Sequence, residues 1–197
     1  MKLWKLSVLC LVIGLLFTVA AALQEQRELS DKLIRLHVIA NSDAEADQQL
    51  KLKVRDALLQ AVDGQNWSDR DEAEAWLQTH LPELQKTCEV CVRQNGSRQT
   101  VAVSLTREEY PTRVYDTFSL PAGEYLSLQV KLGAAAGKNW WCVVYPSICT
   151  ASVSEWKSQS VFSPKEVRLM TGQSKTVTAK FKILEWAETL KKTLKGT

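Results

Sequence analysis

The sequence predicts an α+β fold, a two-layer sandwich with helices on one face of a mostly antiparallel β-sheet. A short segment of alternating apolar residues, 33–40, precedes two stretches whose apolar residues recur at helical spacing. Four β-branched or alternating segments then follow between positions 87 and 145. An order of strand, helix, helix and four strands is typical of helices packed against one side of a sheet.

The first 23 residues predict export. Lys2 and Lys5 form a basic start, and residues 6–23 carry no charge. Such a run is long enough for a signal peptide or for a short membrane anchor. The small residues Ala20, Ala21 and Ala22 permit cleavage near Ala22, yet the run is also long enough to remain in the membrane. The sequence leaves both possibilities open.

Composition limits the classes of partner and the number of domains. The formal charge is +3, and it falls to +1 when Lys2 and Lys5 are removed with the export segment. Nucleic-acid binding needs a concentrated basic field, so we expect no nucleic-acid partner. We expect three segments: residues 1–23 as signal peptide or anchor, 24–150 as the α+β domain, and 151–197 as a linker with an appended amphipathic helix. This last helix could dock on the domain or lie on an anionic membrane.

The first strand and the two helices follow from local patterns. In residues 33–40, Ile34, Leu36 and Val38 share one face of a strand. Ser42 and Glu45 have capping-box spacing before an amphipathic helix that ends before Gly64. A second helix is expected to begin at Ser68, with a break near position 82, where proline stands.

The second half of the domain is predicted to be β-structure. Segments 87–94 and 98–106 flank Asn95-Gly96, and this dipeptide is a strong signal for a two-residue hairpin turn. We therefore expect a hairpin. Residues 125–132 alternate strictly, and a glycine-containing loop, 133–137, leads into the apolar run 140–145, which we expect to be an interior strand.

Four cysteines remain after the export segment, and three pairings are possible. An even number in an exported chain indicates disulfides, although a reducing habitat would leave thiols. We predict that Cys142 pairs with Cys149, because a turn at Pro146 can bring their Cα atoms close enough. The Cys88-x-x-Cys91 pair lies in a segment that alternates like a strand, which favours a structural or free cysteine pair over a redox site. Zinc binding by four cysteines is not expected, because the six-residue spacing of Cys142 and Cys149 is wider than that of structural zinc sites.

No catalytic, metal or cofactor set is evident. His37 lies between apolar strand residues, and Glu108-Glu109 is explained as part of a loop, while Asp43, Glu45 and Asp47 suit a helix N-terminus. No nucleophile elbow or phosphate loop is present in the sequence, so no small-molecule substrate is expected. Adjacent strand residues point to opposite faces, so one of Trp140 and Trp141 can fill the core while the other covers the opposite face or meets a partner.

Five segments of the chain resemble one known family, the stage II sporulation protein R family. They include the motif Leu36-His37-Val38-Ile39-Ala40-Asn41-Ser42-Asp43 and the motif Asn139-Trp140-Trp141-Cys142. The full set of segments is 32–43, 49–57, 110–115, 120–125 and 139–149, with a weaker match at 180–186. The resemblance is least specific at 79–98, so it does not extend to the Cys88 and Cys91 pair.

The resemblance implies a function. Members of this family are made in the forespore of endospore-forming bacteria and exported into the space between the two septal membranes. There they are thought to activate a membrane-embedded aspartic protease of the mother cell, which processes the sigma E precursor. We therefore expect a signalling protein that is not an enzyme. The contact residues that we take from the matching segments are Arg113, Tyr115, Glu124 and Trp140.

Two other classes of function remain open. A cell-envelope hydrolase could assemble a site from His37, Asp43 and Glu124, which are far apart in sequence. A passive envelope-binding module is the third class. An enzyme is expected to show a pocket with perturbed carboxylates, whereas a signal is expected to show an exposed, rigid and partly apolar patch.

Overall fold

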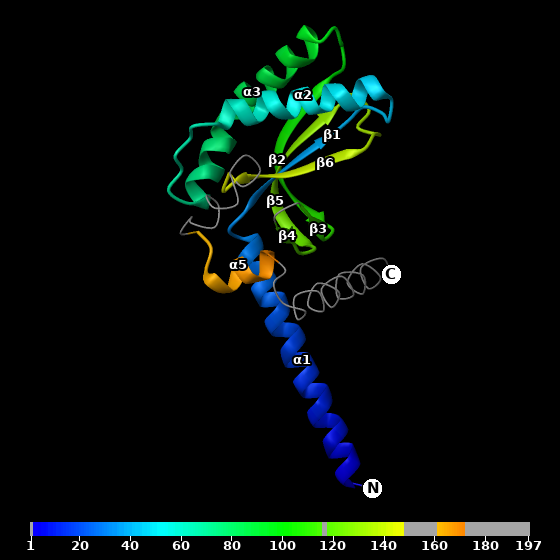
Figure 1. The fold of residues 1–197 in the computed structure, drawn as a ribbon, viewed down its shortest axis with the longest axis vertical. Helices are drawn as coiled ribbons and strands as arrows, with labels where there is room; N and C mark the ends of the chain where they lie inside the picture. The colour runs from blue at the N-terminus through cyan, green and yellow to red at the C-terminus, as the bar shows by residue number, and fades with distance from the viewer. Residues whose placement is uncertain (1, 116–117, 148–160, 172–197) are drawn as a thin grey trace. The chain divides into compact units, whose positions relative to one another are not determined.

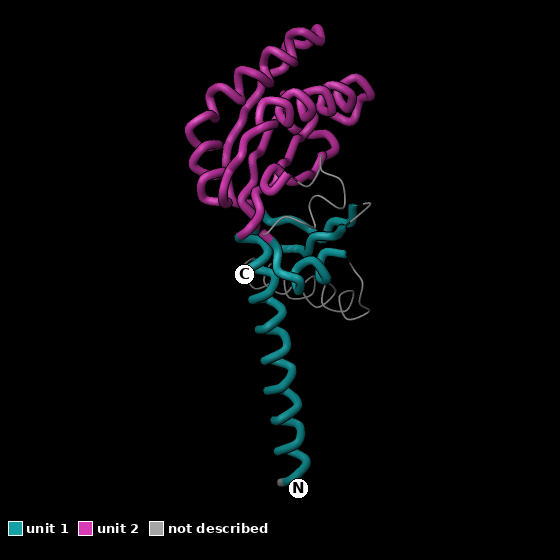
Figure 2. The backbone as a smooth tube through the Cα atoms, turned by 60° about the vertical axis from the view of Figure 1, so that its left-hand side comes forward, with its two compact units in different colours: residues 1–31, 109–124, 162–197 teal, residues 32–108, 125–161 magenta. Residues whose placement is uncertain are grey.

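The computed structural model describes residues 2–115, 118–147 and 161–171 (Figure 1). The chain divides into two compact units, shown in Figure 2. Unit 1 comprises residues 1–31, 109–124 and 162–197, and unit 2 comprises residues 32–108 and 125–161. The segment boundaries expected from the sequence, at positions 23 and 150, stay predictions.

A four-stranded sheet lies mostly in unit 2, and its residues 109–110 and 123–124 belong to unit 1. Its strands are β1 (Ile34–Ile39), β2 (Val101–Tyr110), β5 (Gly123–Leu132) and β6 (Asn139–Tyr145), in the order β2-β5-β1-β6. β1 pairs with β6 in antiparallel fashion and with β5 in parallel fashion. The α+β class is confirmed. The parallel pair arises because β1 inserts between β5 and β6, two strands that are consecutive in the chain.

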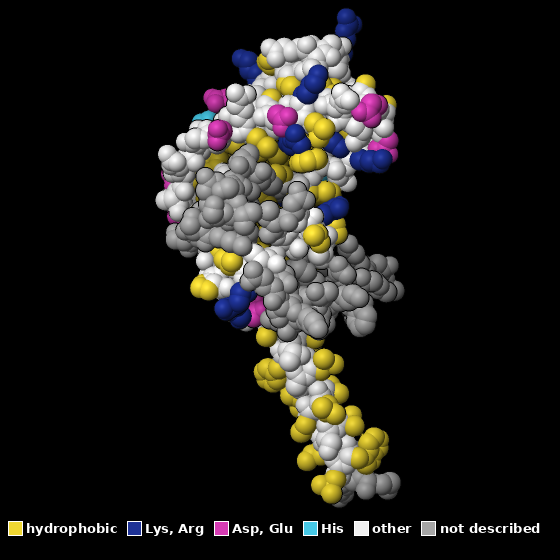
Figure 3. Space-filling view, in the orientation of Figure 1, with side chains coloured by type: hydrophobic (Ala, Val, Ile, Leu, Met, Phe, Trp, Pro, Cys, Tyr) yellow, Lys and Arg dark blue, Asp and Glu magenta, His cyan; other side chains and the backbone are white. Residues whose placement is uncertain are grey.

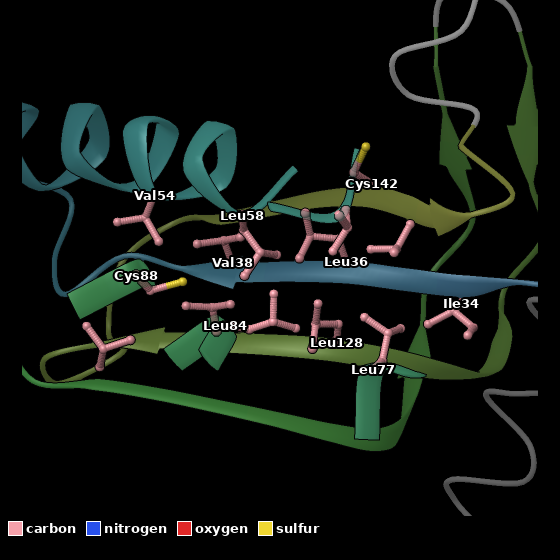
Figure 4. Packing of buried hydrophobic residues seen from close by; sticks show 14 of the residues in the cluster. Ile34, Leu36, Val38, Val54, Leu58, Leu77, Leu84, Cys88, Leu128 and Cys142 are labelled. Carbon is pink, nitrogen blue, oxygen red and sulfur yellow. The ribbon is translucent and has the colours of Figure 1, made fainter. Parts of the chain in front are cut away.

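Two helices cover one face of this sheet. The apolar stripes of α2 (Glu45–Val62) and α3 (Arg70–Gln94) form one buried cluster with side chains of β1, β5 and β6 (Figure 4). Leu36 and Val38 of β1 and Leu128 of β5 are fully buried there. Burial of these large aliphatic side chains supplies the main stabilising contribution, about 1.5–3 kcal/mol for each. The prediction of helices on one face is therefore confirmed.

The predicted strand at 87–94 is wrong, because α3 continues through it to Gln94. Leu84, Cys88 and Cys91 are buried on the inner face of this helix, at helical spacing. The predicted break at Pro82 is also wrong. Pro82 and Gln78 both lie on the exposed side of α3. Because proline has no amide hydrogen, the Gln78 carbonyl receives no helical hydrogen bond from position 82. Water can solvate that carbonyl, so the helix tolerates the proline.

Asn95-Gly96 ends the helix and does not close a hairpin. The Gly96 amide donates to the Arg93 carbonyl at 3.0 Å, and the Ser97 amide donates to the Val92 carbonyl at 3.1 Å. These two bonds form a Schellman motif, in which glycine takes a positive φ, here +74°. The same conformational freedom that suits a hairpin turn is used to cap a helix. The hairpin prediction is therefore wrong.

The helix starts also differ from the predicted caps. Ser42 is not the N-cap of α2: the N-cap is Ala44, which makes no side-chain capping bond, and the Ser42 hydroxyl donates to Asp47. In α3 the N-cap is Asp69, one residue after Ser68, and its carboxylate accepts from the Glu72 amide at 2.9 Å. Ser68 then donates its own amide to the Glu72 carboxylate.

Unit 1 is built from shorter elements around one long helix. It contains α1 (Lys2–Ser30), the hairpin of β3 (Arg113–Val114) and β4 (Ser119–Leu120), and α5 (Pro164–Met170). A capping box between Ser163 and Glu166 starts α5. The appended helix expected between residues 177 and 194 lies outside the described residues.

Candidate functional site

The face of the sheet opposite the helices carries a row of polar side chains. Because side chains alternate along a strand, the positions between the core residues of β1 project to this second face. The register of the sheet places His37 beside Gln129 of β5 and Trp141 of β6. We call the following residues the polar cluster: His37, Glu108, Ser127, Gln129, Asn139 and Trp141.

His37 is the centre of the polar cluster and is only 5% exposed. Its Nδ1 lies 3.1 Å from Oε1 of Glu108, and its Nε2 lies 3.0 Å from Oδ1 of Asn139. The imidazole ring also stacks on the indole of Trp141, with 3.7 Å between ring centroids. One side chain thus joins β1 to β2 and β6, so its orientation is tightly constrained.

Glu108 is the charged member of the polar cluster. Burial alone would raise the pKa of its carboxyl, but hydrogen bonds from His37, Ser127 and Gln129 outweigh burial and hold the pKa below its ordinary value. The carboxylate is therefore ionised at neutral pH. An ionised carboxylate only accepts hydrogen bonds, so Nδ1 of His37 is the donor in this pair.

The polar cluster has a constrained centre and a rim that reaches solvent. Both ring nitrogens of His37 lie within hydrogen-bond distance of protein side chains, with Nδ1 near Glu108 and Nε2 near Asn139. Asn139 is exposed, while Glu108 and Trp141 are half-buried, so the rim of the polar cluster reaches solvent. Within the described ranges, no group of three or more His, Cys, Asp or Glu residues could hold a metal ion.

A second polar network fixes the loop between β1 and α2. The Asp47 carboxylate accepts from the Ser42 hydroxyl, the Asn41 amide and Gln99, and these bonds, that of Ser42 first, lower the pKa of Asp47. Asp43 accepts from the Lys138 backbone amide at 2.7 Å. These contacts tie loop 40–44 to the loop between β5 and β6, which gives the Asn41-Ser42-Asp43 motif a structural role.

Glycine is required where those two loops meet. A Cβ on Gly137 would overlap the backbone carbonyl of Ser42. The Gly137 amide donates to the Ala40 carbonyl at 2.9 Å, so the two backbones lie in direct contact. Lys51 of α2 completes the junction, because its buried ammonium donates to the Lys138 carbonyl at 3.0 Å. Burial lowers the pKa of Lys51.

The candidate contact residues fall in both units. Arg113 lies in β3, Tyr115 stacks on Phe118 with 4.6 Å between ring centroids, and Glu124 is exposed near the start of β5; all three belong to unit 1. Trp140 belongs to unit 2 and packs partly buried on the helix side, beneath the guanidinium of Arg55 at 4.3 Å. Their role in binding stays a prediction.

Trp141, in contrast, lies on the polar face and belongs to the polar cluster. Alternation in the sequence separates the two tryptophans but does not tell which one meets the helices. The loop interpretation of Glu108 and Glu109 is wrong, since both lie in β2. Glu108 and Gln129 could be placed beside His37 only once the strand order was known.

Two other predictions from the sequence concern the site of a cell-envelope hydrolase and a disulfide. His37 and Asp43 of the hydrolase alternative lie in unit 2, whereas Glu124 lies in unit 1. Asp43 is engaged by a backbone amide, and the carboxylate partner of His37 is Glu108. Cys142 is buried in β6, and its predicted disulfide partner Cys149 lies outside the described residues. That disulfide stays a prediction.

Comparison with known proteins gives two matches. A family model described as Stage II sporulation protein R matches residues 30–155, which contain the whole polar cluster. The chain is 31% identical over 177 residues to "Stage II sporulation protein R" of Bacillus subtilis (strain 168), covering 82% of this chain and 78% of that protein. No solved structure matches the chain.

Proposed function

The chain belongs to the stage II sporulation protein R family, and on that premise we propose that it is an exported signalling protein of sporulation. Its target is a membrane-embedded aspartic protease of the mother cell, which processes the sigma E precursor. It acts from the space between the two septal membranes. The observation that carries this proposal is the family match over residues 30–155.

The polar cluster supports binding as the mode of action. A protein that activates a protease by binding must bind the active arrangement of the protease more tightly than the inactive one. A surface held rigid before binding loses little conformational entropy when the complex forms. His37 is fixed by Glu108, Asn139 and Trp141, so the rim of the polar cluster is preorganised in this sense.

We propose two separate sets of contact residues and assign no common surface to them. The first is the rim of the polar cluster, Asn139 and Trp141. The second is the set that the family resemblance supplied, Arg113, Tyr115, Glu124 and Trp140. Arginine and aromatic side chains are enriched among residues that dominate binding energy. Trp140 and Trp141 are adjacent in β6 and project to opposite faces of the sheet, so substitutions at the two positions test the two faces separately.

The proposal is tested in a sporulating strain that lacks this gene. The wild-type chain is expected to restore processing of the sigma E precursor, measured by immunoblot. A chain without residues 2–23 stays in the forespore cytoplasm and is expected to restore none. A chain with an unrelated, uncleaved export helix in place of residues 3–23 is expected to restore it. Normal processing with the cytoplasmic form would contradict intercellular signalling.

Single substitutions then test the proposed contact residues one at a time. Trp141→Ala, Trp140→Ala and Arg113→Ala are each expected to reduce processing while the protein level, read on the same blots, stays near wild type. Val90→Ala, on the exposed side of α3, is the control and is expected to restore full processing. A hydrolytic activity of the purified chain that is lost on changing His37 or Glu124 would favour the envelope-hydrolase alternative.

A further inference from the structure

The N-terminal helix has two halves with different surroundings. Within the described residues it is the one helix long and apolar enough to cross a membrane. Large hydrophobic side chains such as Leu3, Leu11 and Phe17 are exposed along its first half (Figure 3). The uncharged run 6–23 spans roughly 27 Å at 1.5 Å per residue, which is close to the thickness of the hydrocarbon core of a bilayer.

The second half of α1 is packed into the fold of unit 1. Ala22, Gln26 and Leu29 are buried, and their spacing of four and three residues places them on one side of the helix. Gln26 contacts Gly123 so closely that a Cβ at that position would overlap its side-chain amide. Glu25 forms an ion pair with Lys165 of α5, with 2.5 Å between the charged atoms.

The predicted cleavage point lies between these two halves, inside a continuous helix. No glycine or proline occurs between Leu15 and Ser30, and α1 runs without interruption from Lys2 to Ser30. A peptidase must hold the chain extended, so cleavage after Ala22 requires this helix to unwind. Cleavage would also remove buried Ala22 and leave a helix of eight residues, 23–30, which is a marginal length for a helix.

We propose that α1 is retained in the working protein as a membrane anchor, and that it holds unit 1 directly at the bilayer surface. The occupant of its exposed apolar surface is the acyl-chain region of a phospholipid bilayer. Lys2 and Lys5 flank the cytoplasmic end of the span, in agreement with the positive-inside rule, and Trp4 lies among them at the interface. Because no linker separates the span from Gln26 and Leu29, the fold begins where the bilayer ends.

The test uses the full chain expressed in sporulating cells. Membranes are washed with alkaline carbonate, and the size of the protein is compared with two standards. Ala20→Leu places a bulky residue three positions before the cleavage point and gives the uncleaved size; Ala20 is exposed, so packing of unit 1 is unchanged. A chain that begins at Leu23 gives the cleaved size.

We expect the wild-type protein to migrate with the Ala20→Leu standard and to remain in the washed membranes. Migration with the shorter standard would overturn the proposal, and so would release of the full-length protein by carbonate. This readout does not depend on processing of the sigma E precursor. Loss of the proposed signalling role and loss of the anchor are therefore distinguishable.

A second measurement tests the junction itself. In the detergent-solubilised full chain, Leu29→Ala is expected to lower the thermal midpoint of unfolding, because it leaves a cavity in unit 1. Leu11→Ala removes the same atoms from the exposed half of α1 and is expected to leave the midpoint unchanged. Equal effects of the two substitutions would show that the second half of α1 is no part of the folded unit.

Discussion

Alkylation of Cys88 tests whether residues 87–94 belong to a buried helix. Cys88 is fully buried on the inner face of α3, and burial, followed by the nearby Cys91 and Glu89, raises the pKa of its thiol from 9.0 to about 12. The thiolate is the reactive form. At pH 8 the thiolate fraction is roughly one in ten for an ordinary thiol and roughly one in 10,000 for Cys88. A thiolate of higher pKa is the stronger nucleophile, so alkylation of Cys88 should be slower by more than about tenfold.

The assay treats the detergent-purified chain with iodoacetamide at pH 8, both native and unfolded in guanidinium, and follows the Cys88 peptide by mass spectrometry. We expect rapid labelling only in the unfolded chain. Cys91 is more accessible, and burial also raises its pKa, so we expect it to react at an intermediate rate. A Cys91→Ala variant is the control, because Cys88 should remain protected in it.

Equal labelling rates for native and unfolded Cys88 would refute this reasoning. A redox-active Cys-x-x-Cys pair would behave in the opposite way, because one thiol of such a pair has a lowered pKa and reacts fast in the native protein. Failure of Cys88 to react even after unfolding without reductant would indicate a disulfide. That result would contradict the free thiols found at positions 88 and 91.

Three further predictions concern stability, measured by chemical denaturation of the purified chain. Leu84→Ala should lower the free energy of unfolding by about 2–5 kcal/mol through cavity formation, whereas Val90→Ala on the outer side of the same helix should lower it by less than about 0.5 kcal/mol. Gly137→Ala should destabilise the protein more than Gly64→Ala, because a Cβ at position 137 would overlap backbone atoms. A Cβ at position 64 meets open space, so Gly64→Ala carries only the cost of a left-handed conformation at φ +78°, about 1–2 kcal/mol. Because the folded pKa of Glu108 lies below its unfolded value, its contribution to stability is complete above about pH 4.5 and is lost as pH falls through the folded pKa. Glu108→Gln should therefore flatten the stability profile below about pH 4.5, and an unchanged acid slope would contradict the assigned hydrogen bonds.

Local patterns in the sequence determined much of the architecture. The uncharged run 6–23, the alternation in 33–40 and the helical stripe that begins at Leu50 each specify one element through their own periodicity. The strands at 125–132 and 140–145 were identified for the same reason. The motifs of the matching segments predicted membership of the stage II sporulation protein R family. For the candidate site, alternation separated His37 from the core positions of its strand, although the sequence showed no partner for it.

Only the tertiary structure decided which interpretation of an ambiguous pattern holds and which strands meet. Asn95-Gly96 suits a hairpin turn and a Schellman cap equally well, because both need a residue with positive φ; the packing of Cys88 and Cys91 into the core selects the helix. Glu108 lies 71 residues from His37, and a local pattern holds no information about pairing across that distance. The polar cluster forms because β1 lies between β5 and β6. Burial of the other face of the sheet under α2 and α3 stabilises this strand order.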